Sequence, residues 1–222
     1  MFQLSYSSLS VWKDCPRCFY YDRKLKRPRP QGIKSGMPNK VDEILKAGLE
    51  AYRGSLPPTL AALPELKGFQ LYAGADLKKM RHWASNPFYM QDSAGNKVIG
   101  ALDDLLHNPK KDIFAYLDYK TTGKEPDQEF GERYYQDQCD IYTRFFECRG
   151  KKVADFGVLL FFWPAPNDAG DGVMFKSKAL ILHPNPARAE ERFAEAVELL
   201  NGDDIPDAGP TCEFCSFVEA RR

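Results

Sequence analysis

Two neighbouring stretches near the middle of the chain are mostly hydrophobic and are separated by a short polar segment. Val98–Leu106 and Ile113–Thr121 are rich in β-branched, aromatic and aliphatic residues, and residues 107–112 between them have the composition of a turn. The pattern predicts a β-hairpin. Because side chains alternate between the two faces of a strand, Asp118 and Lys120 should lie next to each other on one face.

A third charged residue, Asp103, follows Gly100-Ala101-Leu102 on the first predicted strand. The hairpin would bring its carboxylate close to Asp118 and Lys120, a group that is costly to bury unless a cation binds there. Mg²⁺ or Mn²⁺ suits two carboxylates and could polarise a phosphate oxygen, which indicates phosphodiester hydrolysis. Taken alone, Asp118-Tyr119-Lys120 is also typical of a solvated strand end with an ordinary Asp–Lys pair.

Helical periodicity follows the hairpin. Apolar residues recur at three- and four-residue intervals over Glu132–Glu147, which predicts a helix with Gln138 and Tyr142 one turn apart on one face. Gln138 could bond the lysine, a metal-bound water or a substrate phosphate, with Tyr142 bracing it. Core packing is the alternative for this pair.

A second amphipathic stretch precedes the hairpin. Pro38–Tyr52 predicts a helix with an apolar stripe that faces a core, formed by Val41, Ile44, Leu45 and Leu49. Asp42 lies beside the stripe. Its carboxylate either points into the same site as Asp103 or adds negative charge to the first helical turn, where the helix dipole favours it.

The remaining pattern completes an α/β fold. Phe156–Trp163 and Val173–Leu182 predict another strand pair, and Pro186–Leu200 predicts a final helix that ends at Asn201-Gly202. Helices and strands in this order predict a mixed central sheet flanked by helices. We expect one domain over residues 1–222, since the chain can bury one substantial core and contains no long linker.

Two Cys-x2-Cys pairs lie at opposite ends of the chain, Cys15 with Cys18 and Cys212 with Cys215. In a chain without secretory features such pairs indicate a metal site, and they suit tetrahedral Zn²⁺ as well as an iron–sulfur cluster (4Fe–4S). Either would join the two ends of the chain and stabilise the fold.

The balance of charged residues limits how the chain could bind nucleic acid. Lys plus Arg and Asp plus Glu both number 31, so the formal net charge is zero and affinity for nucleic acid depends on local patches. The basic run Arg23–Arg29 predicts either phosphate contact or a solvated face, while Lys78–His82 and Lys110-Lys111 are typical of solvated surface. No stretch is apolar enough to span a bilayer or act as a signal peptide, so we expect a soluble, cytoplasmic protein with no membrane partner.

The order of these motifs resembles the PD-(D/E)XK nuclease superfamily, and within it the RecB-type and CRISPR-associated adaptation nucleases. The motifs are an acidic residue on an early helix, Gly100-x-x-Asp103, Asp118-x-Lys120 and Gln138-x-x-x-Tyr142. Leu9–Tyr21, with its Cys-Pro-x-x-Phe-Tyr, and Cys212–Cys215 are similar to the terminal segments of those nucleases, so the resemblance covers nearly the whole chain.

The resemblance implies a restriction-endonuclease-like core and a DNA nuclease that depends on Mg²⁺ or Mn²⁺. It implies Asp103 and Asp118 as metal ligands, Lys120 as the catalytic lysine, and Gln138 with Tyr142 as the fourth motif. The implied substrate is single-stranded DNA or duplex ends, in DNA repair, recombination or the processing of phage or CRISPR DNA. The resemblance implies a prokaryotic or phage-encoded protein. Because the chain carries no motor motif, a helicase or another DNA-processing protein is the implied partner for any unwinding.

Two features depart from the relatives. Many RecB-type members carry a histidine on the early helix, where this chain has Asp42, so the metal would gain one more carboxylate. Iron–sulfur members usually contribute one N-terminal and three C-terminal cysteines, whereas this chain offers two and two. Family likeness favours iron and the two-plus-two arrangement favours zinc. A catalytically idle subunit that binds nucleic acid or assembles a complex, with the same fold, is the alternative function.

Overall fold

The structure is a computed structural model that describes residues 1–30, 36–167, 170 and 172–221. Its larger sheet has the strand order β2-β5-β6-β8-β9, with β7 also paired to β6. The bounds are β2 Gln70–Leu71, β5 Asp104–Asn108, β6 Ile113–Thr121, β7 Lys152–Val153, β8 Gly157–Ala165 and β9 Met174–Leu182. Because β6 runs parallel to β7 and β8 while the other pairs are antiparallel, the sheet is mixed, as predicted.

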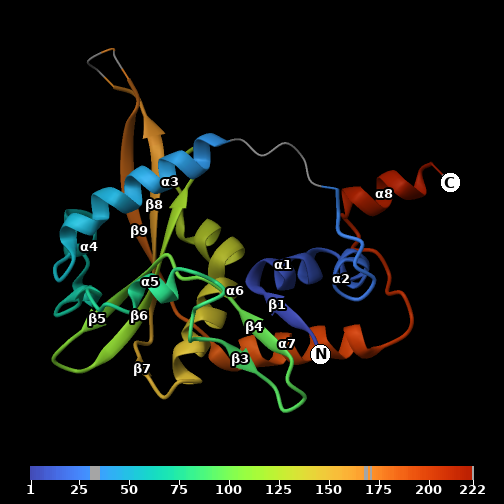
Figure 1. The fold of residues 1–222 in the computed structure, drawn as a ribbon. Helices are drawn as coiled ribbons and strands as arrows, with labels where there is room; N and C mark the ends of the chain where they lie inside the picture. The colour runs from blue at the N-terminus through green and yellow to red at the C-terminus, as the bar shows by residue number, and fades with distance from the viewer. Residues whose placement is uncertain (31–35, 168–169, 171, 222) are drawn as a thin grey trace.

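Helices cover both faces of this sheet (Figure 1). The long helices are α3 Gly36–Leu49, α6 Gln128–Glu147 and α7 Pro186–Asn201. The terminal helices are α1 Tyr6–Asp14, α2 Pro16–Arg23 and α8 Glu213–Glu219. Short turns of helix lie at η1 Glu50–Tyr52, α4 Pro58–Ala61, η2 Pro64–Leu66 and α5 Leu77–Met80.

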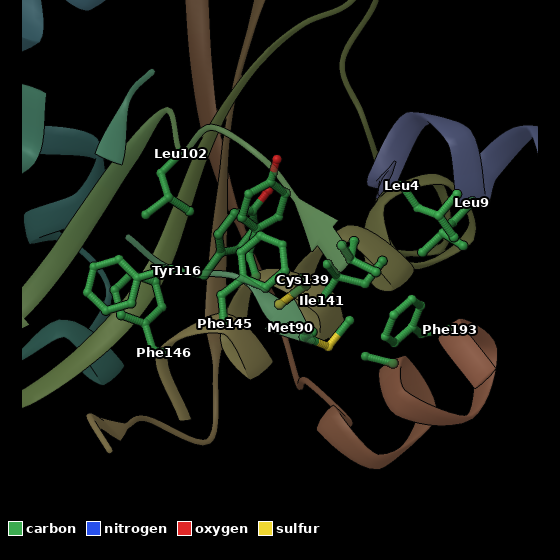
Figure 2. Packing of buried hydrophobic residues seen from close by; sticks show 14 of the residues in the cluster. Leu4, Leu9, Met90, Leu102, Tyr116, Cys139, Ile141, Phe145, Phe146 and Phe193 are labelled. Atoms are coloured by element: carbon green, nitrogen blue, oxygen red, sulfur yellow. The ribbon is translucent and has the colours of Figure 1, made fainter. Parts of the chain in front are cut away.

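Two hydrophobic clusters lie on opposite faces of β6. Phe114 and Tyr116 pack with α6 and α7 on one face, while Leu117 and Tyr119 pack with α3 and α4 on the other. Figure 2 shows the first cluster as a continuous group of side chains, from Phe146 at one end to Leu9 and Phe193 at the other. Asp118 and Lys120 follow the alternation and therefore belong to the α6 face.

The hairpin prediction is confirmed for β5 and β6, with Asp104 paired to Leu117 and Asn108 to Ile113. The prediction of one strand over Val98–Leu106 is wrong. Residues Lys97–Ile99 form β4, which pairs with β1 (Gln3–Ser5) and β3 (Met90–Gln91) in a separate small sheet. The chain leaves β4 at Gly100 and enters β5 at Asp104, so Asp103 lies at a bend.

A close contact explains why glycine is needed at this bend. A Cβ atom added to Gly100 would lie 2.5 Å from the hydroxyl oxygen of Tyr142, which α6 holds against the bend. The two strands therefore separate where the backbone must pass the tyrosine. The break is a packing effect across the fold, and strand periodicity carries no signal of it.

Capping residues fix the helix ends. The Asp127 side chain accepts a hydrogen bond of 2.8 Å from the Phe130 amide, so α6 begins at Gln128, before the predicted Glu132. Asn185 caps α7 in the same way, and α7 matches its predicted range closely. The predicted helix Pro38–Tyr52 is found as α3 followed by η1.

The apolar stripe predicted on α3 is only partly buried. Leu49 is buried, but Ile44 is 62% exposed, so the prediction that the whole stripe faces a core is wrong. The helix packs against β6 along one side, and its Lys46 and Asp42 side chains lie toward the end of the hairpin that holds Asp103.

Candidate active site

The β5–β6 hairpin brings the two predicted carboxylates together. The pairing of Asp104 with Leu117 places Asp103 next to Asp118, one position further along the ladder. One carboxylate oxygen of Asp103 (Oδ2) accepts a hydrogen bond of 3.3 Å from the Tyr119 amide. The backbone of β6 therefore fixes one side of Asp103, and its other oxygen, Oδ1, faces α3.

Asp118 is the buried centre of the site, with 3% of its surface exposed. The ammonium group of Lys120 forms an ion pair with its Oδ2 and also lies 4.9 Å from the centre of the Tyr135 ring. Burial raises the pKa of Asp118 to about 7. Lys120 lowers this pKa, but the nearby Asp103 carboxylate partly offsets that effect. Even with Lys120 beside it, the buried carboxylate is therefore costly to keep ionised, and a further cation would favour its charged form.

Gln138 of α6 reaches the same carboxylate. Its amide nitrogen donates a hydrogen bond of 3.1 Å to Asp118 Oδ1. Its carbonyl oxygen is buried and has no hydrogen-bond partner among the described residues. A buried acceptor without a donor, beside a buried carboxylate, fits a site that receives a hydrated cation.

Tyr142 lies one turn further along α6. Its ring stacks on Tyr116 at 5.4 Å between centres, and its hydroxyl group reaches the bend at Gly100 and Ala101. Burial raises the pKa of Tyr142, so the hydroxyl group stays protonated. The tyrosine supports the bend that presents Asp103.

Asp42 lies at the open rim of this cluster. The Lys46 ammonium group bridges Asp42 Oδ2 at 2.9 Å and Asp103 Oδ1 at 2.8 Å. Since α3 begins at Gly36, Asp42 lies beyond its first turn, and the first-turn interpretation of this residue is wrong. The structure brings Asp42 to the site through Lys46, a residue that the sequence motifs did not single out.

The four cysteines meet at the other end of the molecule, where α2 and α8 lie side by side (Figure 1). Their sulfur atoms all lie within 4.8 Å of one another. The sulfur separations are 3.8 Å for Cys15 and Cys215, 3.6 Å for Cys18 and Cys212, and 3.7 Å for Cys18 and Cys215. The predicted four-cysteine cluster is confirmed.

Donors surround these sulfur atoms. The Gly209 and Cys18 amides point at Cys15 Sγ at 3.2 and 3.5 Å, and the Arg29 guanidinium lies 3.4 Å from Cys212 Sγ. Burial disfavours the Cys15 thiolate, but these two amides and the neighbouring thiols outweigh it and lower the pKa of Cys15 to about 6. The Cys15 thiolate is therefore a ready metal ligand, whereas burial raises the pKa of Cys18 and Cys215.

A comparison with protein families matches residues 3–220 to the PD-(D/E)XK nuclease superfamily. The chain belongs to this superfamily. Membership implies a nuclease-like function, and the mixed sheet flanked by helices agrees with the fold of these nucleases. A search of curated proteins finds no match.

An acidic residue that sequence patterns missed lies behind the candidate site. Asp104 is fully buried on the opposite face of the hairpin and binds Arg53 at 2.6 Å and Arg81 at 2.9 Å, while Tyr119 donates its hydroxyl proton to it. Arg81 also donates a hydrogen bond of 2.8 Å to the Asp103 carbonyl oxygen. The sequence did carry one signal for this residue. Asp103 and Asp104 are adjacent at the start of β5, and because neighbouring side chains on a strand face opposite ways, Asp104 should lie on the face away from Asp103.

The basic runs are largely engaged within the protein. Arg81 is part of the Asp104 network, so the prediction that Lys78–His82 is solvated surface is wrong for this residue. Within Arg23–Arg29, Lys24 pairs with Asp203 and Arg29 with Asp14. No helix among the described residues is both long and apolar enough to cross a membrane.

We expect Arg53→Met to destabilise the protein by about 3–5 kcal/mol, because one partner of a buried ion pair is removed and Asp104 loses its closest cation. Urea unfolding followed by circular dichroism measures this change. Lys67→Met, at an exposed position, is the control and should leave the midpoint of urea unfolding unchanged. An unchanged midpoint for Arg53→Met would mean that the ion pair between Arg53 and Asp104 does not contribute to stability.

Proposed function

We propose that this protein is a DNA nuclease that hydrolyses phosphodiester bonds with Mg²⁺ or Mn²⁺ at Asp103 and Asp118. The observation that carries the proposal is the convergence of these two carboxylates, Lys120 and Gln138 at one end of the β5–β6 hairpin. Asp42 of α3 is linked to Asp103 by Lys46, whose ammonium group bridges the two carboxylates at the rim of this site.

The donor set suits a hard cation, because carboxylate and amide oxygens are the ligands that Mg²⁺ and Mn²⁺ prefer. When bound, such an ion supplies charge neutralisation at the phosphate and a more acidic water. The chain's own residues hold the geometry: the Tyr119 amide orients Asp103, and Gln138 orients Asp118. Lys120, fixed between Asp118 and the Tyr135 ring, places its ammonium group to stabilise negative charge that develops on the phosphate.

The alternative of an idle subunit is not favoured. Membership of a nuclease superfamily argues for activity, and the cluster keeps a buried carboxylate whose pKa is raised to about 7. Such a group is costly to the fold, and packing alone gives no reason to retain it.

We also infer that the four cysteines bind one tetrahedral Zn²⁺ ion instead of a four-iron cluster. A Zn–S bond of about 2.3 Å gives sulfur separations of roughly 3.8 Å at the corners of a tetrahedron. The three separations of 3.6, 3.7 and 3.8 Å agree with a single ion. In a four-iron cluster each thiolate binds a different iron, and the cluster's own atoms hold the thiolates further apart.

The proposed function is tested by incubating end-labelled linear and circular single-stranded DNA with the protein and Mn²⁺, beside Asp118→Ala. We expect wild-type protein to degrade DNA and the variant to be inactive, since the variant lacks the central ligand. Cleavage of the circle would show that no free end is needed. Equal cleavage by both proteins would mean a contaminating nuclease or a different site, and no cleavage by either would favour the idle subunit.

A further inference from the structure

An ammonium group lies against Asp103, one of the two carboxylates that would hold the metal ion. Lys46 Nζ lies 2.8 Å from Asp103 Oδ1, the oxygen that is not held by the Tyr119 amide. A divalent ion that uses Asp103 needs an oxygen of this carboxylate. Its approach therefore competes with Lys46.

We propose that Lys46 holds Asp103 in the metal-free protein, yields this carboxylate to the divalent ion, and then contacts a phosphate of the bound DNA. The proposal rests on the proposed nuclease function and concerns a residue that no nuclease motif of this chain includes.

The two groups on Asp103 differ in how freely they can move. The Tyr119 amide belongs to β6, a central strand paired on both sides, so it stays in place. Lys46 is on a flexible side chain that is 30% exposed at the rim of the site. The lysine is thus the partner that an arriving ion displaces.

Displacement does not leave the ammonium group unpaired. Asp42 lies one turn earlier on α3, at the spacing where helical side chains meet, and its Oδ2 is already 2.9 Å from Lys46 Nζ. Lys46 can therefore lose its ion pair with Asp103 while it keeps the one with Asp42. The ammonium group then stays beside the site with a charged partner on its own helix.

The charge of the cluster changes sign when the ion binds. Three carboxylates (Asp42, Asp103, Asp118) and two ammonium groups (Lys46, Lys120) give a formal charge of −1. A divalent cation makes it +1, which favours a phosphate at the same opening. Lys46 at the rim is then free to meet that phosphate, while Lys120 remains inside with Asp118.

The test measures Mn²⁺ binding to zinc-loaded, DNA-free protein by isothermal titration calorimetry, for wild type, Lys46→Met and Lys40→Met. Methionine keeps the length of the side chain and removes the charge. Lys40 is the matched control, because it lies on the same helix and, among the described residues, forms an ion pair with the exposed Glu43 and no other. Without its competitor, Lys46→Met should bind Mn²⁺ roughly 3- to 10-fold more tightly, whereas Lys40→Met should match wild type.

A second readout follows the DNA. The KM for a short single-stranded substrate at saturating Mn²⁺ should rise roughly 3- to 10-fold in Lys46→Met, with a smaller change in kcat, because a phosphate contact is lost. Tighter metal binding combined with weaker DNA binding is a result that mere loss of packing would not give. Lys46→Arg, which keeps the charge, should restore the KM toward wild type.

The outcomes separate this inference from the proposed function. If wild-type protein binds Mn²⁺ and Asp118→Ala does not, the metal site stands. Unchanged Mn²⁺ affinity in Lys46→Met would then overturn the role of Lys46 alone. If wild-type protein binds no Mn²⁺ that depends on Asp118, the metal site and the role of Lys46 both fail.

Discussion

Replacing Lys120 with alanine should reduce DNA cleavage by about 10²–10³-fold while the protein stays folded and binds DNA. The ammonium group is the nearest positive charge to Asp118, and it is placed to stabilise charge that develops on the phosphate. The fold should tolerate the loss because the pKa of Asp118 is already about 7 and its carboxylate can take up a proton. Single-turnover cleavage at saturating Mn²⁺ measures the effect.

Lys178→Ala is the matched control for this prediction. Lys178 lies on β9, in the same cross-strand row as Lys120 through Phe161, but it pairs with Glu125 at 3.1 Å on the surface. Its removal should leave the cleavage rate unchanged. If Lys120→Ala cuts DNA as fast as wild type, the assignment of this lysine to the chemistry is wrong.

Replacing Cys212 with serine should cost about 5 kcal/mol of stability and lower the melting temperature by about 10–20 °C. The proposed zinc site would link positions that are 200 residues apart, Cys15 and Cys215, so its loss would free nearly the whole chain in the unfolded state. A strong chelator should have the same effect on wild-type protein. Calorimetry with and without the chelator measures both changes.

Cys148→Ser is the control, because this exposed cysteine lies outside the cluster and its replacement should leave the melting temperature unchanged. Protein purified without oxygen should be colourless and contain one zinc ion per chain. A brown protein with visible absorbance and four iron atoms per chain would refute the zinc assignment. Full stability after metal removal would refute the structural role of the cluster.

Local patterns predicted the centre of the site because its residues are close in the sequence and follow a simple period. Alternation along Ile113–Thr121 placed Asp118 and Lys120 on one face of β6, and helical spacing placed Gln138 on the inner face of α6. The cysteine pairs were recognisable for the same reason, since two short motifs carry all four sulfur atoms.

The residues that the sequence did not reveal depend on contacts between distant elements. Lys46 matters only because α3 lies over the bend at Asp103, and Arg53 and Arg81 matter only because they meet at Asp104. The division of the predicted strand at Gly100 depends on the Tyr142 side chain from α6. The periodicity of a single segment carries no information about contacts between side chains of distant segments.

The turn between β5 and β6 sets the register of the hairpin and thereby determines which side chains of β6 reach the candidate site. Asn108 accepts hydrogen bonds of 3.2 Å from the amides of Lys110 and Lys111, and Asp112 adopts a positive φ of 51°. This turn lies roughly 20 Å along the strand from Asp118, yet it fixes which residues of β6 face α6. A slip of one residue would exchange Asp118 and Lys120 for Leu117 and Tyr119. An insertion in this turn that shifts the register would thus abolish the proposed nuclease activity, because Asp118 and Lys120 would face the wrong side of the sheet.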